Sequence, residues 1–355
     1  MFIGRTCLRF GLGGGGTDLY SYASTHGGFL CSITIDLHAT VIAERPLFDP
    51  RIRVKVHDTI ELVDELTMLK NEEVRAALAL TGITSNVELV YMGEITGGTG
   101  LGTSGAYLVN LVNILNYFRG IRLTPVELAE AAAHIEIDVL GHNCGRHDHY
   151  LAALGGLVIL NISKDGSVQA DRVGISPDIL KKLRDHLLLL YTHRQHVSGK
   201  ILGVQQDSMK RGDQRTFDCY HRIKEIGYEV VKALREGDVV RVCKLFDQHW
   251  LVKRELPGGV SDQYFDFLYG EALKNGALGG KVLGAGGGGC ILIGCEPARR
   301  VQVKNALCQY GLEEVPFNFD FRGVDLDCSK AKPHELVPFS GTPRRMVHFD
   351  SDLVS

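Results

Sequence analysis

Residues 97–106 read Gly97-Gly98-Thr99-Gly100-Leu101-Gly102-Thr103-Ser104-Gly105-Ala106 and lead directly into a helical pattern. From Ser104 to Phe118, apolar residues recur with the i, i+3, i+4, i+7 spacing of an amphipathic helix. Glycines let backbone N–H groups come close to a ligand, and a helix start adds partial positive charge. Because this combination suits a phosphate group, the segment predicts a nucleotide site.

This phosphate site needs a source of positive charge. The segment lacks the GxxxxGK[ST] pattern, so it does not resemble the P-loop of nucleoside triphosphatases. Without the lysine of that loop, a metal ion is the usual way to neutralise phosphate charge. Ser104, in the first helical turn, offers a hydroxyl ligand for Mg2+. The alternative is that Thr103 or Ser104 only caps the helix.

A second glycine-rich segment, Gly11 to Gly16, follows a predicted strand and precedes Thr17 and Asp18. It matches GxGxxG with Asp36 twenty residues beyond, which is the pattern of a dinucleotide-binding fold. Asp18, however, places a carboxylate where a pyrophosphate would lie, and Arg9 is a charged residue within the strand. We therefore favour a small-ligand loop in which Arg9 is a fixed cation and Asp18 accepts sugar hydroxyls. A simple tight turn is the remaining alternative.

Charged side chains gather between Glu136 and Tyr150. Glu136 lies near the end of a helix predicted over 125–140, where a carboxylate is unfavourable unless a cation compensates it. Asp148 follows a Gly-Arg turn. We interpret Asp148 as a general base and Glu136 as a Mg2+ ligand. Two alternatives stay open, a histidine-rich surface turn and a zinc cluster, and the zinc cluster would use His142, Cys144, His147 and His149.

A third glycine-rich segment, Gly284 to Gly289, joins strands predicted at 281–283 and 290–295. A plain turn needs one or two glycines, whereas this stretch has five. The excess predicts a close approach of its backbone to a ligand or to another loop. A merely flexible connection is the alternative.

Strands and helices alternate along the chain without the regular rhythm of a doubly wound sheet, which favours an α+β fold. The other predicted strands are 5–10, 29–35, 39–44, 52–56, 87–92, 156–162 and 187–192. The other predicted helices are 73–81, 199–211, 214–236, 238–253, 261–275 and 297–310. Polar turn residues between 164 and 176 mark a candidate boundary, so we expect domains at 1–172 and 173–329. Residues 330–355, rich in proline and charge, are expected to form a poorly ordered tail.

Composition restricts the class of protein. The 355 residues are 45% hydrophobic and 23% charged, as in a globular protein with a sizeable core. The net charge of −3 does not indicate nucleic acid or an anionic membrane as the main partner. Nine scattered cysteines without a CxxC pair disfavour a disulfide framework. With no secretion segment recognisable at the start, we expect a cytoplasmic protein.

Together, the three glycine-rich segments resemble the three motifs of the GHMP kinase superfamily, in the same order. Residues 100–106 are similar to the family's GLGSSA phosphate loop. Residues 8–19 look most like the bacterial branch that phosphorylates heptose 7-phosphate at its anomeric carbon, and 147–153 occupy the place of that branch's QDQYAA stretch. The resemblance implies an N-terminal domain like ribosomal protein S5 domain 2 and a C-terminal ferredoxin-like domain, with the active site between them.

The resemblance also implies a role for individual residues. Asp148 would take the proton from the sugar hydroxyl and Arg9 would assist it, while Ser104 and Glu136 would hold Mg2+. The ATP phosphates would be wrapped by Gly98, Thr99, Gly100, Leu101, Gly102, Thr103, Ser104 and Gly105. The substrate side would be formed by Gly15, Gly16, Thr17, Asp18, Gly286 and Gly287.

The activity implied by the resemblance is ATP- and Mg2+-dependent phosphorylation of a sugar. The expected acceptor is D-glycero-D-manno-heptose 7-phosphate, converted to the 1,7-bisphosphate on the route to nucleotide-activated heptose for surface polysaccharide. A kinase of an unphosphorylated sugar such as fucose or galactose is one alternative, and a ligand sensor without catalysis is another. Basic side chains at the sugar end would favour the phosphorylated acceptor, and Lys281, Arg194 and Arg146 are candidates. The expected partners are small molecules, with a homodimer compatible with the sequence and no nucleic acid or membrane.

Overall fold

The computed structural model describes residues 1–195, 197–332 and 335. Its strands form two sheets. The strands of the first sheet are β1 (Phe2–Gly13), β2 (Gly28–Glu44), β3 (Ile52–Val56), β4 (Thr59–Val63), β5 (Val87–Gly93), β6 (Leu157–Ile162), β7 (Val168–Arg172) and β12 (Asp325–Asp327). Those of the second sheet are β8 (Leu187–Tyr191), β9 (Ala277–Val282), β10 (Cys290–Cys295) and β11 (Glu313–Glu314).

Most strands pair antiparallel, and within the described chain only β3 and β5 pair in parallel. The order in the first sheet is β12-β1-β2-β5-β3-β4, with β6 and β7 continuing from another part of β2, and the second sheet runs β11-β8-β10-β9. Antiparallel sheets with helices collected beside them are the arrangement of an α+β fold. The predicted fold class is therefore confirmed.

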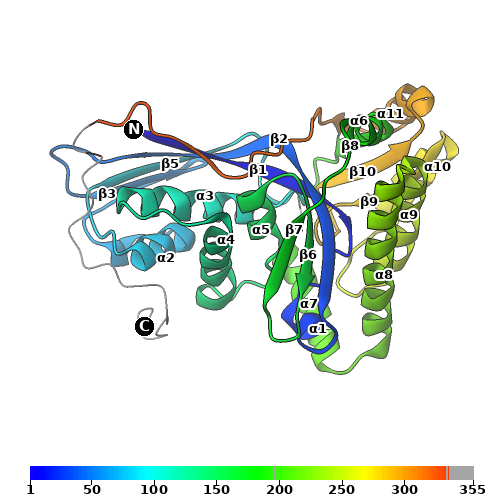
Figure 1. Cartoon of the computed structure of the whole chain (residues 1–355), viewed down its shortest axis with the longest axis horizontal. Coiled ribbons are helices and arrows are strands. Elements are labelled where there is room, and N and C mark those ends of the chain that lie inside the picture. Colours follow the sequence, from blue (N-terminus) through cyan, green and yellow to red (C-terminus); the bar gives the residue numbers. More distant parts are fainter. Residues whose placement is uncertain (196, 333–334, 336–355) are drawn as a thin grey trace.

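The helices connect and cover these sheets. The longer ones are α1 (Tyr20–His26), α2 (Glu72–Thr81), α3 (Thr103–Phe118), α4 (Pro125–Ala133), α5 (His147–Leu154), α6 (Pro177–His186), α7 (Ser198–Lys210), α8 (Gln214–Glu236), α9 (Val239–Lys253), α10 (Gln263–Lys274) and α11 (Arg300–Cys308). Three short turns are η1 (Leu66–Met68), η2 (His134–Val139) and η3 (Pro297–Arg299). Figure 1 shows α2 to α5 on one side of the first sheet, and α8 to α10 beside β9 and β10.

The central helix α3 follows its predicted pattern closely. Its apolar residues Leu108, Leu111 and Leu115 are completely buried between the first sheet and the neighbouring helices. Burying a leucine side chain contributes on the order of 1.5–3 kcal/mol, so this one stripe anchors the helix firmly to the sheet. The N-terminal end of α3 is thereby held in a defined place.

Several predicted elements differ from the structure. The strands predicted at 29–35 and 39–44 are one strand, β2, whose pairing with β1 shifts register opposite Cys7 and Leu8. Such a bulge inserts extra residues without ending the strand. The helix predicted over 125–140 is α-helical only to Ala133 and then widens into the π-helical turn η2. Short elements that the pattern did not predict include α1, α5, α6, β4, β7, β11 and β12.

After the second sheet the chain returns to the first. Residues beyond β11 run back along β2 and β1 and end in β12, which pairs with β1 (Figure 1). The predicted division at 172/173 falls at the end of β7 and stays a prediction. Within the predicted tail, Glu335 is buried and contacts the amino group of Met1, whereas 333–334 and 336–355 lie outside the described residues. No helix in the described part of the chain is both long and apolar enough to span a membrane.

Candidate active site

A cavity of about 440 Å3 lies where the three glycine-rich segments meet. Its walls come from the end of β1, the start of α3, the turn η2, α5, α7, α9 and the loop between β9 and β10. Of the predicted site residues, those that line it are Arg9, Gly15, Gly16, Asp18, Gly98, Gly100, Gly102, Thr103, Ser104, Glu136 and Asp148. The fold thus gathers groups that are more than 100 residues apart in sequence.

The loop before α3 owes its shape to its glycines. Gly98, Gly100 and Gly102 have φ angles of 74°, 79° and 77°, a region that side chains disfavour. The loop is fastened to β1, because the Arg9 N–H donates to the Leu101 carbonyl at 3.0 Å. Among the predicted phosphate-binding residues, Thr99, Leu101 and Gly105 are buried and lie behind the cavity wall.

The start of α3 carries hydroxyl groups directed to the cavity. Ser104 Oγ donates to Glu136 Oε1 at 2.5 Å. Thr103 also lines the cavity, and its buried Oγ1 has no hydrogen-bond partner among the described residues. The N-cap is Gly102, with no side-chain cap, so the capping alternative for Thr103 and Ser104 is wrong. An unsatisfied buried hydroxyl beside a hydroxyl–carboxylate pair fits oxygen ligation of a hard cation such as Mg2+.

Glu136 is nearly buried, and the π-helical turn η2 directs it toward α3. Burial alone would raise its pKa, but the contacts with His142 and His149 and the charge of His149 hold the pKa of Glu136 below its ordinary value. His149 Nε2 lies 2.7 Å from Glu136 Oε2. His149 is therefore the group that compensates the carboxylate at this helix end: burial lowers the pKa of His149, but its contact with Glu136 outweighs burial and raises that pKa above the ordinary value. Glu136 is ionised at neutral pH.

Arg9 and Asp148 form one ion pair across the cavity wall. Arg9 Nε donates to Asp148 Oδ1 at 2.8 Å, Nη2 donates to the same oxygen, and Nη1 donates to the Gly100 carbonyl at 2.7 Å. Burial would raise the pKa of Asp148, but the charge of Arg9 and the hydrogen bond from His147 hold it well below the ordinary value. Asp148 is a carboxylate at any physiological pH. It lies in the first turn of α5, where the helix dipole also favours negative charge.

The first glycine-rich segment contributes Gly15, Gly16 and Asp18 to the cavity. Asp18 Oδ2 accepts from the His147 backbone N–H at 3.1 Å. Thr17, in contrast, is completely buried outside the lining, and its hydroxyl donates to the carbonyls of Gly14 and Phe29. Asp18 is thus presented to a ligand, whereas Thr17 holds the turn.

The third segment packs against the phosphate loop. The Cys290 N–H donates to the Thr99 carbonyl at 2.9 Å, and a Cβ at Gly100 would lie 2.7 Å from the Leu283 backbone. Gly284 lines the cavity, but Gly286 and Gly287 pack on Val260 outside the lining. The close approach predicted for this segment is therefore to another loop.

The histidines around Asp148 are engaged with carboxylates and a hydroxyl. His147 Nδ1 lies 3.1 Å from Asp148 Oδ1, and its Nε2 pairs with the Ser32 hydroxyl. His142 and His149 both contact Glu136. The alternative of a zinc cluster from His142, Cys144, His147 and His149 finds no support, because each of these histidines is turned toward an acidic or hydroxyl partner.

Two groups of lining residues were missed by sequence reasoning. The first group contains the rings of His57, Tyr91 and Tyr107, with Tyr91 4.6 Å from Tyr107 and 5.2 Å from His57 between ring centroids, and we name it the aromatic end of the cavity. The second contains the basic side chains of His249, Lys253 and Lys281, and we name it the floor. Neither group shows a recognisable sequence pattern. Its charge alone made Lys281 a candidate for the sugar end of the site. Arg146 and Arg194, the other candidates, pair with Glu130 and Asp262 and do not line the cavity.

Family models match both halves of the chain. The model of the GHMP kinases N terminal domain matches residues 69–156, which include the phosphate loop, Glu136 and Asp148. The model of the GHMP kinases C terminal domain matches residues 230–312, which include α9 and the third glycine-rich segment. The chain thus carries the N-terminal and C-terminal domains of a GHMP kinase. ATP is the phosphoryl donor of this kinase family.

Relatives of this GHMP kinase include several sugar kinases. It is 26% identical over 333 residues to D-glycero-alpha-D-manno-heptose 7-phosphate kinase of Campylobacter jejuni, covering 90% of this chain and 97% of that protein. It is 23% identical to L-fucokinase/L-fucose-1-P guanylyltransferase of Bacteroides fragilis, covering 86% of this chain but 36% of that protein.

Solved structures give the same fold. A D-glycero-D-manno-heptose 1-phosphate kinase from Bacteroides thetaiotaomicron superposes with a TM-score of 0.75 at 22% identity, covering 92% of this chain and 98% of that one. Galactokinase of Lactococcus lactis, solved with galactose, superposes with a TM-score of 0.72 at 17% identity, covering 91% and 94%. The GHMP kinase fold expected from the motifs is therefore confirmed.

Proposed function

We propose that this GHMP kinase transfers the γ-phosphoryl group of ATP to the anomeric hydroxyl of a sugar phosphate, with D-glycero-D-manno-heptose 7-phosphate as the acceptor. The observation that carries the proposal is the Arg9–Asp148 pair, which lines the same cavity as the phosphate loop and lies directly against that loop and the start of α3. The Campylobacter jejuni relative, similar along almost its whole length, supports this acceptor over fucose or galactose.

Catalysis of phosphoryl transfer depends mainly on positioning the reactants and stabilising their charges. In the proposal, the backbone N–H groups of the loop and the first turn of α3 hold the ATP phosphates. The aromatic end of the cavity, with Tyr91 and Tyr107, receives the base. Asp18, Gly15 and Gly16 face the sugar, while Thr17, Gly286 and Gly287 support those contacts from outside the cavity.

Mg2+ is part of the proposal because the residues present fit it. Ser104 and Glu136 would hold the ion, and the unpaired hydroxyl of Thr103 lies next to them. A bound Mg2+ neutralises charge on the phosphates. His149 keeps Glu136 ionised and in place for this purpose.

Asp148 and Arg9 act on the acceptor hydroxyl. A carboxylate with a low pKa is a weak base, so Asp148 orients the hydroxyl and accepts its proton late, as the sugar oxygen bonds to phosphorus. Arg9 cannot supply a free charge in this state, because all three of its nitrogens donate to Asp148 or Gly100. Its role is to hold Asp148 and the phosphate loop in one geometry.

ADP release from ATP tests the proposal across heptose 7-phosphate, fucose, galactose and mannose. We expect turnover with heptose 7-phosphate and a new anomeric phosphate in the 31P NMR spectrum. Asp148→Asn should lower kcat by about 100-fold or more, the usual contribution of a positioned base. Wild-type protein that phosphorylates none of these sugars would rule out the proposed activity. Full activity of Asp148→Asn would reject only the assigned base.

The expected cytoplasmic location and the compatibility with a homodimer remain predictions. Light scattering after size-exclusion chromatography shows directly whether the protein is a homodimer. The cavity is built from one chain, so we expect the activity per subunit to be independent of protein concentration.

A further inference from the structure

The floor of the cavity is basic and buried. His249 and Lys253 lie one turn apart on α9, and Lys281 lies on β9, against which α9 packs. All three line the cavity, and their exposed fractions are 3%, 8% and 4%. Burying a charged group without a counter-charge is costly, so buried lysines need an explanation.

The hydrogen-bond partners of the two lysines are backbone carbonyls, and Lys281 Nζ also lies 5.0 Å from the centroid of the Phe246 ring. Lys253 Nζ donates to the carbonyls of Val282 at 3.0 Å and Gly284 at 2.6 Å, and Lys281 Nζ donates to the Leu12 carbonyl at 2.9 Å. No carboxylate among the described residues pairs with either lysine. An ammonium group has three donors. Lys253 therefore keeps one N–H and Lys281 keeps two for a further acceptor.

His249 has unused hydrogen-bonding capacity in the same place. Both of its ring nitrogens are buried and have no partner among the described residues. The pKa of His249 lies well below its ordinary value, mainly because the ring is buried and also because Lys281 and Lys253 place positive charge nearby. The ring is thus neutral and offers one N–H donor.

We propose that His249, Lys253 and Lys281 form a subsite for a phosphate group at the floor of the cavity. A phosphate supplies the missing negative charge and accepts the spare N–H groups of the lysines and the histidine. The neighbouring Arg9 is already committed to Asp148 and Gly100, so it does not compete for this anion. Lys281 also binds the carbonyl of Leu12 in the first glycine-rich segment, and Lys253 binds that of Gly284 at the start of the third. A phosphate held by both lysines would therefore link the two segments.

The electrostatics agree with this arrangement. Burial, followed by the charge of Arg9, lowers the pKa of Lys253 to about 7. Burial, followed by the charge of Lys253, lowers the pKa of Lys281 well below its ordinary value. A bound phosphate restores both positive charges. The subsite rests on the proposed kinase function, in which two phosphates can reach it: the one already on the acceptor and the γ-phosphate of ATP.

Kinetics with a matched pair of acceptors test the subsite. The variants are Lys281→Met and Lys253→Met, which remove the charge and keep the length of the side chain. The control is Lys244→Met, an exposed lysine on the same helix. KM and kcat are measured for heptose 7-phosphate, for the same heptose without phosphate, and for ATP.

We expect Lys281→Met to raise KM for heptose 7-phosphate on the order of 10- to 100-fold, the usual effect of losing a hydrogen bond to a charged group. KM for the unphosphorylated heptose and for ATP should stay unchanged. A rise in KM confined to ATP would instead assign the subsite to the γ-phosphate. That result would still support a phosphate subsite. Equal rises for both heptoses, or no change for any ligand, would overturn the subsite.

A direct binding measurement separates this proposal from the proposed function. If wild-type protein phosphorylates neither heptose, the kinase proposal fails, and calorimetry with inorganic phosphate then tests the subsite by itself. Saturable binding that Lys281→Met and Lys253→Met abolish, and that Lys244→Met keeps, supports the subsite. Absence of binding to wild type, or equal binding to all four proteins, refutes it. Melting temperatures of the variants check that they are folded.

Discussion

At the scale of single residues, the carboxylate of Glu136 combines burial, ionisation and a hydroxyl neighbour. Its charge is compensated by His149, and Ser104 donates to its second oxygen. A buried carboxylate is retained in a core only where its charge is used or paired. Here His149 pairs with Glu136 Oε2, while Oε1 accepts from Ser104 at the start of α3.

The metal assignment predicts the behaviour of Glu136→Gln. Losing the carboxylate should raise the Mg2+ concentration for half-maximal rate on the order of 10- to 100-fold, the range seen when groups around a bound metal are altered. Titrating activity with Mg2+ at saturating ATP measures this shift. Asp138→Asn is the control, because Asp138 lies on the same turn but is exposed and contacts His134. An unchanged Mg2+ dependence in Glu136→Gln would remove Glu136 from the metal site.

At the scale of elements, the contact between α3 and α5 explains why residue 105 is glycine. Its φ angle is not positive, so the backbone conformation alone does not require a glycine there. A Cβ at Gly105 would lie 2.7 Å from Asp148 Cβ, 3.1 Å from Asp148 C and 3.2 Å from His149 N. Two of these atoms belong to the α5 backbone and cannot rotate away. Gly105 thus lets α5 bring Asp148 close to the start of α3.

Gly105→Ala should therefore damage both stability and activity. Alanine favours a helix by up to about 1 kcal/mol over glycine, but overpacking costs about 1–3 kcal/mol, so the clash should win. We expect a melting temperature lower by a few degrees, and a kcat lowered because Asp148 is displaced.

Gly97→Ala is the matched control for this prediction. Gly97 begins the same loop, a Cβ added to it would meet no atom within 4 Å, and its φ is not positive. The melting temperature of Gly97→Ala should equal that of wild type. A Gly105→Ala protein as stable and active as Gly97→Ala would show that the two helices have room to separate.

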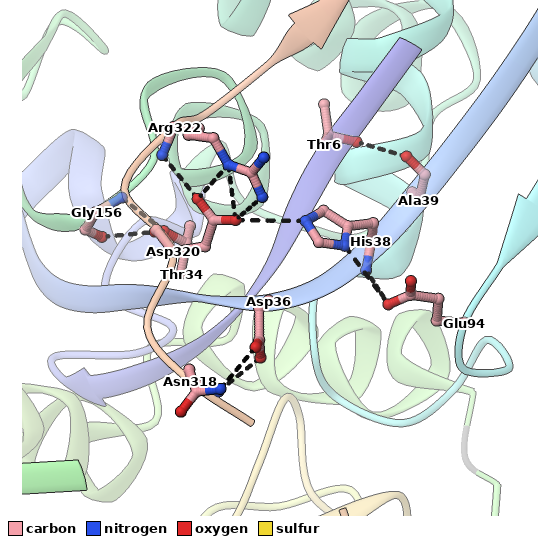
Figure 2. A network of polar contacts seen from close by, with 10 residues as sticks. All are labelled: Thr6, Thr34, Asp36, His38, Ala39, Glu94, Gly156, Asn318, Asp320 and Arg322. Atoms are coloured by element: carbon pink, nitrogen blue, oxygen red, sulfur yellow. Dashed lines mark hydrogen bonds and ion pairs between the residues drawn. The ribbon is translucent and has the colours of Figure 1, made fainter. Parts of the chain in front are cut away.

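At the scale of the whole molecule, the segment after β11 leads the chain back from the second sheet to the first. We name residues 317–327, which follow β11 and end in β12, the C-terminal strap. Figure 2 shows its polar contacts with β2: Asn318 binds Asp36, and Asp320 faces His38. Asp320 also accepts several hydrogen bonds from Arg322 within the strap. The C-terminal strap is thereby tied to the sheet that carries Arg9.

The charge of Asp320 should make this attachment sensitive to acid. The hydrogen bond from Arg322 is the main cause that lowers the pKa of Asp320 from 3.8 to about 2. A lowered carboxylate pKa contributes stability that is fully present above pH 3.8 and is lost as the pH falls toward 2. Asp320→Asn should therefore unfold at a lower temperature than wild type at about pH 7, and the difference should shrink between about pH 4 and pH 2.

Thermal melts from neutral to strongly acidic pH measure this convergence. Asp58→Asn, in the exposed turn between β3 and β4, serves as the control and should follow wild type at every pH. A stability difference for Asp320→Asn that stays constant down to the acid end of the range would show that its contribution does not depend on the carboxylate charge.

Local pattern was sufficient for most of the long helices and for the chemistry of the motifs. The apolar spacing after Ser104 predicted α3, and the glycines with hydroxyls before it predicted a phosphate loop. Both depend on neighbours in sequence, through backbone freedom and helical periodicity. The resemblance carried by the three motifs led to the GHMP kinase family, which the family models support at residues 69–156 and 230–312.

Tertiary structure decided how these pieces combine. The pairing of Arg9 with Asp148, of Glu136 with His149, and the basic floor with Lys253 and Lys281 join residues from distant elements. No spacing rule encodes such contacts, because they depend on how α5 and α9 pack against the sheets. Sequence alone thus determined that this chain has a phosphate loop and the fold that contains it. Only packing decided which charges are paired and which N–H groups are left for a ligand.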